Sequence, residues 1–199
     1  MRKSEYIQKL NYRDERFCYV MKNCHHMSRE QALEVVSQNR LLAYQHQGLI
    51  RKLHYIYHSK QQTAYELTDR GRSWIRKNLP QLGPNFYVSG TAVRHNIRLA
   101  EQVMAHSLEH GRTWLNERDL RQELMQRIER MEGEERFTLL RQLERGELSV
   151  PDGGYYEDGQ LYTVEIYNDN YTAEVLAAKD LCAQTLGASL RFVRQDSVK

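Results

Sequence analysis

Cysteine and proline are both scarce in this chain, which has three of each in 199 residues. An odd number of cysteines at unrelated spacings argues against a disulfide framework and favours reduced thiols in a cytoplasmic protein. Cys24 directly precedes His25 and His26, but no second pair of ligands lies nearby, so the pattern does not predict a zinc site. No apolar run is long enough to span a membrane, and the N-terminal residues are charged throughout, so we expect neither a transmembrane helix nor a signal peptide.

Charge, by contrast, is abundant and unevenly distributed. Residues 1–79 carry 15 Lys and Arg against 7 Asp and Glu, whereas residues 80–199 carry 14 against 19. The first part is therefore basic and the second acidic, although the net charge of the whole chain is only +3. A basic segment of this kind favours a polyanionic partner such as nucleic acid, with ordinary surface charge as the alternative.

The basic part of the chain is expected to begin with helices. Apolar side chains recur at near-helical spacing in residues 5–24. Ser28 and Gln31 match a capping box at the start of a second, short helix, and Ser37 can cap a third helix that Gly48 would end. Two short helices joined by a tight turn are typical of a helix-turn-helix.

A pair of strands is predicted directly after these helices. LIRKLHYIY alternates apolar and polar residues, HSKQQT forms a polar loop, and AYELT returns as a second strand before Thr68 caps another helix. This order of two helices, a strand, a basic loop, a strand and a helix resembles the winged helix-turn-helix domain. We therefore expect residues 1–79 to form such a domain.

In a domain of this kind the second helix of the motif enters the major groove of DNA, where its exposed side chains contact bases or phosphates. With Leu41 and Tyr44 turned inward, the outward-facing residues of this helix would be Gln38, Asn39, Arg40, Ala43 and His46. The residues expected to contact the DNA backbone or the minor groove from the strand and loop, at 51–63, are Arg51, Lys52, His58 and Lys60. Because winged helices also bind proteins, a protein-binding module is the alternative.

Prolines and glycines concentrate around residues 80–90, which we predict to be a linker between two domains. Residues 91–199 are expected to form an α/β domain that begins with a helix and ends with the strand ASLRFVRQ. Within it, residues 120–147 are amphipathic and highly charged, with a break near Gly133. This segment is either a solvated helical insertion or a dimerisation element.

Two carboxylates flank a predicted β-hairpin in the second domain. Asp158 and Gly159 are a two-residue turn signal, and with these as the loop Asp152 stands opposite Glu165. Cross-strand partners lie about 5 Å apart at Cβ, so two carboxylates placed there need a cation or a shared proton. Such a pair of oxygen ligands suits Mg²⁺. Alternatively, the two glycines after Asp152 make a bulge that shifts the register and leaves Asp152 as a turn residue.

A Pro-Asp pair followed by a Glu in the next strand is the pattern of metal-dependent nucleases of the PD-(D/E)xK type. In those enzymes a Lys normally stands two residues after the Glu, and Tyr167 occupies that position here. A Tyr hydroxyl is uncharged at pH 7 and does not supply the positive charge that helps to activate water. Lys179, in the helix predicted to follow, could reach back toward the same site.

A winged helix, a linker and then the pattern W-x-x-E, PDG, VEI and K resemble the replication-relaxation family of plasmid and mobile-element proteins. The resemblance implies a DNA-binding winged helix and a PD-(D/E)xK-like domain, with roles in replication, mobilisation or gene control. Carried over to this chain, the acidic positions are Glu117, Asp152 and Glu165, while Tyr167 departs from the nuclease pattern.

The sequence thus predicts an α+β protein that binds specific sites on double-stranded DNA, as a transcriptional regulator or an accessory factor of a bacterial plasmid, phage or mobile element. The second domain is expected to be an inactive nuclease-like scaffold without a cofactor, serving dimerisation or a protein partner. A homodimer is expected because one winged helix contacts only a short site. The alternative is a Mg²⁺-dependent endonuclease in which Asp152 and Glu165 bind the metal and Glu117 and Lys179 complete the site.

Overall fold

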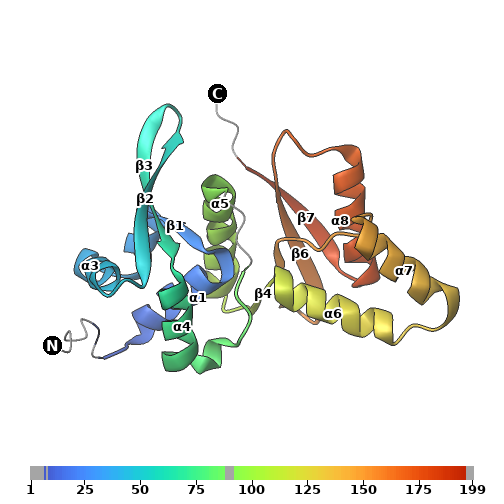
Figure 1. Ribbon diagram of the computed structural model, residues 1–199, viewed down its shortest axis with the longest axis horizontal. Coiled ribbons are helices and arrows are strands. Elements are labelled where there is room, and N and C mark those ends of the chain that lie inside the picture. The colour runs from blue at the N-terminus through green and yellow to red at the C-terminus, as the bar shows by residue number, and fades with distance from the viewer. Residues whose placement is uncertain (1–6, 8, 88–91, 196–199) are drawn as a thin grey trace. The chain divides into compact units, whose positions relative to one another are not determined.

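The computed structural model describes residues 7, 9–87 and 92–195 (Figure 1). Within it the chain divides into two compact units, the first ending at Leu108 and the second beginning at Glu109. Each unit contains helices and a sheet of its own, so the α+β class predicted from the sequence is confirmed.

In the first unit, helices surround a three-stranded antiparallel sheet with the strand order β1-β3-β2 (Figure 1). Its elements are α1 (Tyr12–Cys24), β1 (His26–Ser28), α2 (Arg29–Val35), α3 (Gln38–His46), β2 (Ile50–Tyr57), β3 (Lys60–Leu67), α4 (Asp69–Asn78) and α5 (Val93–Val103). A 3-10 turn at Pro80–Leu82 follows α4, and a π-helical turn at Met104–Glu109 follows α5.

Side-chain caps start these helices where the sequence predicts. Ser28 and Gln31 form the predicted capping box at α2, and Ser37 and Thr68 cap α3 and α4. The first helix is shorter than the amphipathic stretch from which it was inferred, because Asn11 caps it and it begins at the next residue.

The sheet of the first unit differs from the sequence-based prediction in two ways. The three-residue strand β1 was not predicted; it pairs with β3, with His26 opposite Glu66. The β2–β3 hairpin is closed by only His58 and Ser59, which have φ of 47° and 59° and fit a two-residue turn of type I′. Most of the segment expected to be a polar loop is therefore strand.

The segment predicted to be a linker packs within the first unit as far as the structure describes it. The Tyr87 amide donates to the Lys22 carbonyl of α1 at 2.9 Å, and Phe86 is 2% exposed. The next helix, α5, was expected to open the second domain, yet it packs against α1 and β1. The boundary between the units therefore lies near Leu108 and not at residues 80–90, of which 88–90 lie outside the described part.

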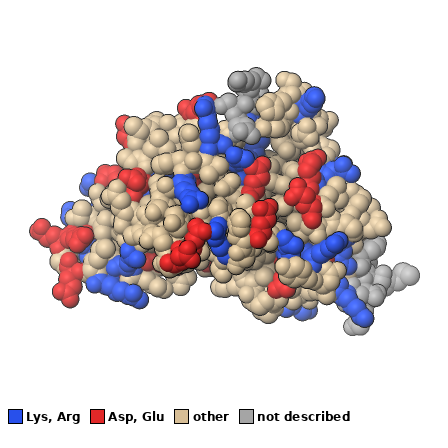
Figure 2. Space-filling view, turned by 180° about the vertical axis from the view of Figure 1, so that it is seen from behind, with Lys and Arg blue, Asp and Glu red and all other residues tan. Residues whose placement is uncertain are grey.

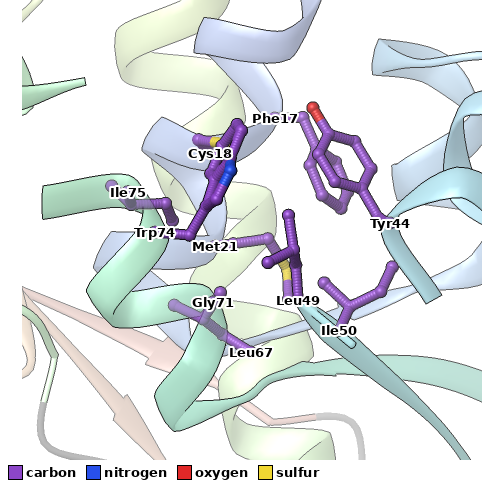
Figure 3. A pocket seen from close by; sticks show the side chains of 10 residues that line it. All are labelled: Phe17, Cys18, Met21, Tyr44, Leu49, Ile50, Leu67, Gly71, Trp74 and Ile75. Carbon is purple, nitrogen blue, oxygen red and sulfur yellow. The ribbon is translucent and has the colours of Figure 1, made fainter. Parts of the chain in front are cut away.

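The core of the first unit brings α1, α3 and α4 against the start of the β2–β3 hairpin (Figure 3). Tyr44 of α3 stacks on Phe17 of α1, with ring centroids 4.9 Å apart. Gly71 lies where α4 meets the hairpin, and a Cβ at this position would overlap the Leu49 carbonyl oxygen. A glycine is therefore required here for close packing.

The second unit has a four-stranded mixed sheet with the order β4-β5-β6-β7. Its elements are β4 (Trp114–Asn116), α6 (Glu117–Glu129), α7 (Gly133–Arg145), β5 (Gly153–Glu157), β6 (Gln160–Tyr167), α8 (Ala173–Thr185) and β7 (Ser189–Arg194). The pairs β4–β5 and β5–β6 are antiparallel, whereas β7 runs parallel to β6 after the α8 crossover.

The register predicted for the β5–β6 hairpin is confirmed. Asp158 and Gly159 form the loop with φ of 49° and 79°, and Gly153 pairs with Val164. Because the pairing is continuous from the loop to this point, the alternative with a glycine bulge is wrong. The two glycines serve packing instead, since a Cβ on Gly153 would overlap the Trp114 ring.

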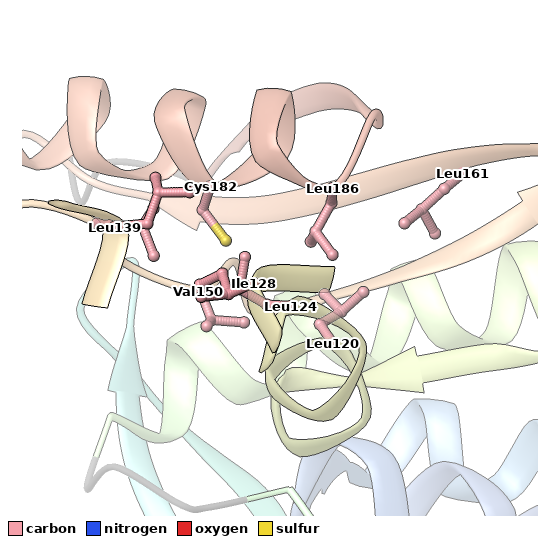
Figure 4. Close-up of a cluster of buried hydrophobic side chains, with 9 residues drawn as sticks. Leu120, Leu124, Ile128, Leu139, Val150, Leu161, Cys182 and Leu186 are labelled. Carbon is pink, nitrogen blue, oxygen red and sulfur yellow. The ribbon is translucent and has the colours of Figure 1, made fainter. Parts of the chain in front are cut away.

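Helices α6 and α7 break near Gly133 as predicted, but they are not a solvated insertion. Leu120, Leu124 and Ile128 of α6 are fully buried and form one core with residues of α7 and α8 (Figure 4). Burying a Leu or Ile side chain contributes roughly 1.5–3 kcal/mol. Because the apolar faces of these helices form the core, the charged side chains of the segment lie on their outer faces.

Candidate functional site

Helix α3 presents a polar face to solvent in the first unit. Leu41 and Tyr44 point into the core, with 0% and 1% exposed, as predicted. The remaining positions include the exposed residues Gln38, Asn39 and His46, while Ala43 is half-buried. Most of the side chains expected to contact DNA from this helix are thus accessible.

Arg40 is placed differently from the sequence-based expectation. Its Nε and Nη2 donate to the two carboxylate oxygens of Asp14 at 2.6 and 2.5 Å, and Nη2 also donates to the Lys9 carbonyl. Asp14 is buried and accepts a further hydrogen bond from the Tyr44 hydroxyl at 2.7 Å. Although burial raises the pKa of Asp14, these hydrogen bonds hold it below its usual value. Arg40 therefore ties α3 to α1 instead of facing a DNA groove.

The β2–β3 hairpin carries the basic side chains predicted for the strand and loop. Arg51, Lys52, His58 and Lys60 are all exposed. The Arg51 Nε donates across the hairpin to Glu66 Oε2 at 2.8 Å, so the charge of Arg51 is partly compensated. Lys52 and Lys60 therefore carry most of the positive charge of this hairpin.

The two faces of this hairpin have different surroundings. Lys52, His54 and Ile56 alternate along one face and are exposed, with Ile56 62% exposed. On the opposite face, the Arg94 guanidinium of α5 lies 5.3 Å from the centre of the Tyr57 ring. The exposed side chains at Lys52, His54 and Ile56 are therefore accessible to a partner.

In the second unit, Asp152, which directly precedes β5, lies beside Glu165 of β6. The Asp152 amide donates to Glu165 Oε2 at 3.1 Å, and the Ile166 amide donates to Asp152 Oδ2 at 2.8 Å. Asp152 is 8% exposed and Glu165 is 0% exposed. The predicted carboxylate pair therefore exists, but it is held inside the fold.

Lys179 of α8 reaches this carboxylate pair. Its Nζ lies 3.0 Å from Glu165 Oε2 and donates to the Val150 carbonyl at 2.7 Å. The Tyr167 ring, which occupies the usual lysine position, packs near the Phe192 ring at 6.0 Å between centroids. A lysine from the following helix thus supplies the positive charge that the strand motif lacks.

Tyr171 completes the cluster, although the sequence reasoning did not single it out. Its hydroxyl donates to Glu165 Oε1 at 2.8 Å, so both carboxylate oxygens of Glu165 have partners. Burial and the neighbouring charge of Asp152 raise the pKa of Glu165 to about 7, while Lys179 and Tyr171 act in the opposite direction. No local signal marks Tyr171, because the residue joins Glu165 only through the loop that follows β6.

Glu117, the third predicted acidic position, is the first residue of α6. The pairing of Asn116 with Gly153 places Glu117 at the level of Asp152 along the sheet. Its carboxylate lies 3.8 Å from the Arg121 guanidinium. Within the described residues, Glu117 does not form a group of three potential metal ligands with Asp152 and Glu165.

One group of three potential metal ligands does occur in the described residues, formed by His25, His26 and Glu66 within 4.8 Å of one another. The Arg72 guanidinium, always a donor, lies 3.1 Å from His25 Nδ1, so the ring proton is on Nε2, 3.4 Å from Glu66 Oε1. Arg51 already pairs with the same carboxylate. With two guanidinium groups alongside, hydrogen bonds and ion pairs of this cluster link the end of α1, α4 and β3.

Comparison of the chain with protein-family models, curated proteins and solved structures finds no match. The resemblance to the replication-relaxation family therefore stays a prediction. Among the helices of the described residues, none is both long and apolar enough to cross a membrane.

Proposed function

We propose that the first unit binds double-stranded DNA as a winged helix-turn-helix domain. Its elements follow the order helix, strand, helix, helix, strand, strand, and the sheet order β1-β3-β2 is the one expected for a winged helix. In this assignment α2 and α3 are the helix-turn-helix, and the β2–β3 hairpin is the wing.

The observation that carries the proposal is the exposed polar face of α3 followed directly by a hairpin that carries exposed basic side chains on both of its faces. Gln38 and Asn39 have amide groups that can pair with adenine edges in the major groove. Lys52 and Lys60 on the hairpin suit phosphate oxygens, which need a cation but no fixed geometry. The role as a regulator or accessory factor of a plasmid, phage or mobile element belongs to the same proposal.

The test is selection of a preferred duplex from random sequences, followed by fluorescence anisotropy at several salt concentrations. Asn39→Ala should weaken binding to the selected duplex by about 1–3 kcal/mol and relax its sequence preference. Lys52→Ala should weaken binding to all duplexes alike. It should also reduce by about one the magnitude of the slope of the logarithm of the binding constant against the logarithm of the salt concentration. Arg145→Ala, which removes an exposed charge from the second unit, is the matched control and should change neither. A chain that binds no duplex at low salt would refute the proposal.

For the second unit we propose a nuclease-like scaffold without catalytic activity. Three antiparallel strands followed by a helix and a parallel strand, with the carboxylate pair at the central strands, support the nuclease-like assignment. The hydrogen bonds argue against a metal, because Lys179, the Asp152 amide and Tyr171 already occupy the oxygens of Glu165. A divalent cation would have to displace them, so we derive no step through Mg²⁺.

One observation keeps a Mg²⁺-dependent endonuclease as a second candidate, namely the position of Lys179 beside Glu165. Supercoiled plasmid incubated with the protein and Mg²⁺ or Mn²⁺ separates the two proposals. An intact plasmid supports the inactive scaffold. Nicking by the natural chain, lost in both Asp152→Asn and Lys179→Met, would establish the endonuclease instead.

A further inference from the structure

We propose that α7 carries a self-complementary surface through which two copies of this chain associate. The surface, called here the α7 surface, is a shallow groove lined by Glu134, Phe137, Leu140, Arg141 and Glu144. The proposal concerns the second unit and goes beyond DNA binding by the first.

The α7 surface has an apolar centre that the fold leaves uncovered. Phe137 is 62% exposed, which is among the highest values for large apolar side chains in the described residues. Its neighbour Leu139 is buried in the core of the unit, and this fixes the rotation of the helix. Because successive helical residues are turned by about 100°, Phe137 points outward. Leu140, at the edge of that core, extends the apolar centre.

Charges of both signs border this apolar centre. Glu134 lies one turn before Phe137 and Arg141 one turn after it. Around the helix, both are rotated from Phe137 in the same direction, so the three side chains share one face. No ion pair among the described residues includes either of them. The Arg141 Nε donates to the Phe137 carbonyl of its own helix at 3.3 Å, which holds Arg141 beside Phe137.

These positions make the surface complementary to itself. When two copies of α7 lie antiparallel about a two-fold axis near Phe137, the Phe137 rings of the two copies meet at the axis. The same axis places Glu134 of one copy opposite Arg141 of the other, and it does so twice, as a two-fold interface requires. A second copy of the chain therefore satisfies both the apolar centre and the charges beside it.

The size of the surface sets the expected affinity. One pair of helices of 13 residues buries less than the roughly 800 Å² per partner of a standard protein interface. We therefore expect a weak dimer, with a dissociation constant on the order of 10 μM, in exchange with the monomer.

Sedimentation equilibrium of the full chain from about 1 to 200 μM, a range that brackets this affinity, tests the proposal. We expect Arg141→Glu to raise the dissociation constant at least about tenfold, since it places like charges opposite each other twice. The double variant Glu134→Arg with Arg141→Glu restores opposite charges and should return the constant to within about threefold of the natural value. Phe137→Ser should give a monomer throughout.

Arg136→Glu is the matched control, because it makes the same charge change at the residue before Phe137, which is turned about 100° from Phe137 around the helix. It should leave the dissociation constant unchanged. A natural chain that is monomeric at all concentrations, a double variant no tighter than Arg141→Glu, or an equal loss in Arg136→Glu would each overturn the proposal. Circular dichroism confirms that every variant is folded, and none of these readouts depends on DNA.

Discussion

Glu165 is the residue whose protonation the fold controls most closely. Burial and the Asp152 charge raise its pKa to about 7, against a usual value of 4.5. Because the folded chain holds this proton more tightly than the unfolded chain, the stability that Glu165 contributes is fully present below about pH 4.5 and is lost as the pH rises to about 7. This behaviour is the reverse of that of a carboxylate whose pKa is depressed by folding.

The first prediction follows from this loss of stability with rising pH. Glu165→Gln removes the titrating group, so the variant should lose less stability than the natural chain between pH 5 and pH 8. Urea unfolding at several pH values measures the difference. Glu129→Gln, at an exposed position of α6, should leave the pH dependence unchanged. Identical pH profiles for Glu165→Gln and the natural chain would show that Glu165 is ionised throughout.

The second prediction concerns the partner of Glu165. Lys179→Met leaves a carboxylate buried without its cation, and breaking a buried pair in this way typically costs about 3–5 kcal/mol. The loss should be larger at pH 8, where Glu165 is ionised, than at pH 5, where it is protonated. In the Glu165→Gln background the effect of Lys179→Met should shrink at pH 8. An equal cost in both backgrounds would mean that Lys179 acts through packing alone.

At the scale of secondary-structure elements, what the sequence predicts correctly is local. The caps at Ser28, Ser37 and Thr68 depend on neighbouring residues only, and so does the two-residue turn at Asp158. That turn also determines the register, which is why the meeting of two carboxylates could be anticipated. Strand β1 was missed because three residues carry no periodicity, and their pairing with β3 is a tertiary contact.

For the site residues too, the sequence predicts local features but not long-range contacts. Arg40 has the type and spacing of a base-contacting side chain, but the sequence does not show that Asp14, 26 residues earlier, would lie beside it. Helix α5 was assigned to the wrong unit for a similar reason, since the packing of its apolar face on α1 is invisible in its own spacing. Long-range contacts, polar and apolar alike, are thus what local sequence patterns do not reveal.

The third prediction tests how tightly two elements pack. In Gly71→Ala the new Cβ would overlap the Leu49 carbonyl oxygen, so α4 would have to move away from the hairpin. We expect a loss of about 3 kcal/mol, at the upper end of the usual cost of overpacking. Gly83→Ala, which has a positive φ of 81° but open space around it, should cost only about 1 kcal/mol. Thermal and urea unfolding would show the difference, and equal costs would contradict the packing argument.

At the scale of the whole molecule, the two units differ in charge more clearly than the sequence-based boundary suggested. Residues 1–108 carry 17 Lys and Arg against 8 Asp and Glu, whereas residues 109–199 carry 12 against 18. On the face seen in Figure 2 the two kinds of side chain are interspersed, so this face carries no single patch of one charge. A basic unit that binds DNA and an acidic unit that binds a second copy would be a consistent division of roles.

The last prediction joins the two proposals and depends on both. If α7 pairs two chains and each first unit binds one half-site, then a duplex with two half-sites should bind the natural chain more tightly than a duplex with one. Phe137→Ser should bind the single half-site as the natural chain does but lose roughly tenfold or more on the double site. Arg136→Glu should behave as the natural chain on both duplexes. Equal losses of affinity on the single and double sites would mean that Phe137 supports folding. No loss on either site would mean that association through α7 does not contribute to DNA binding.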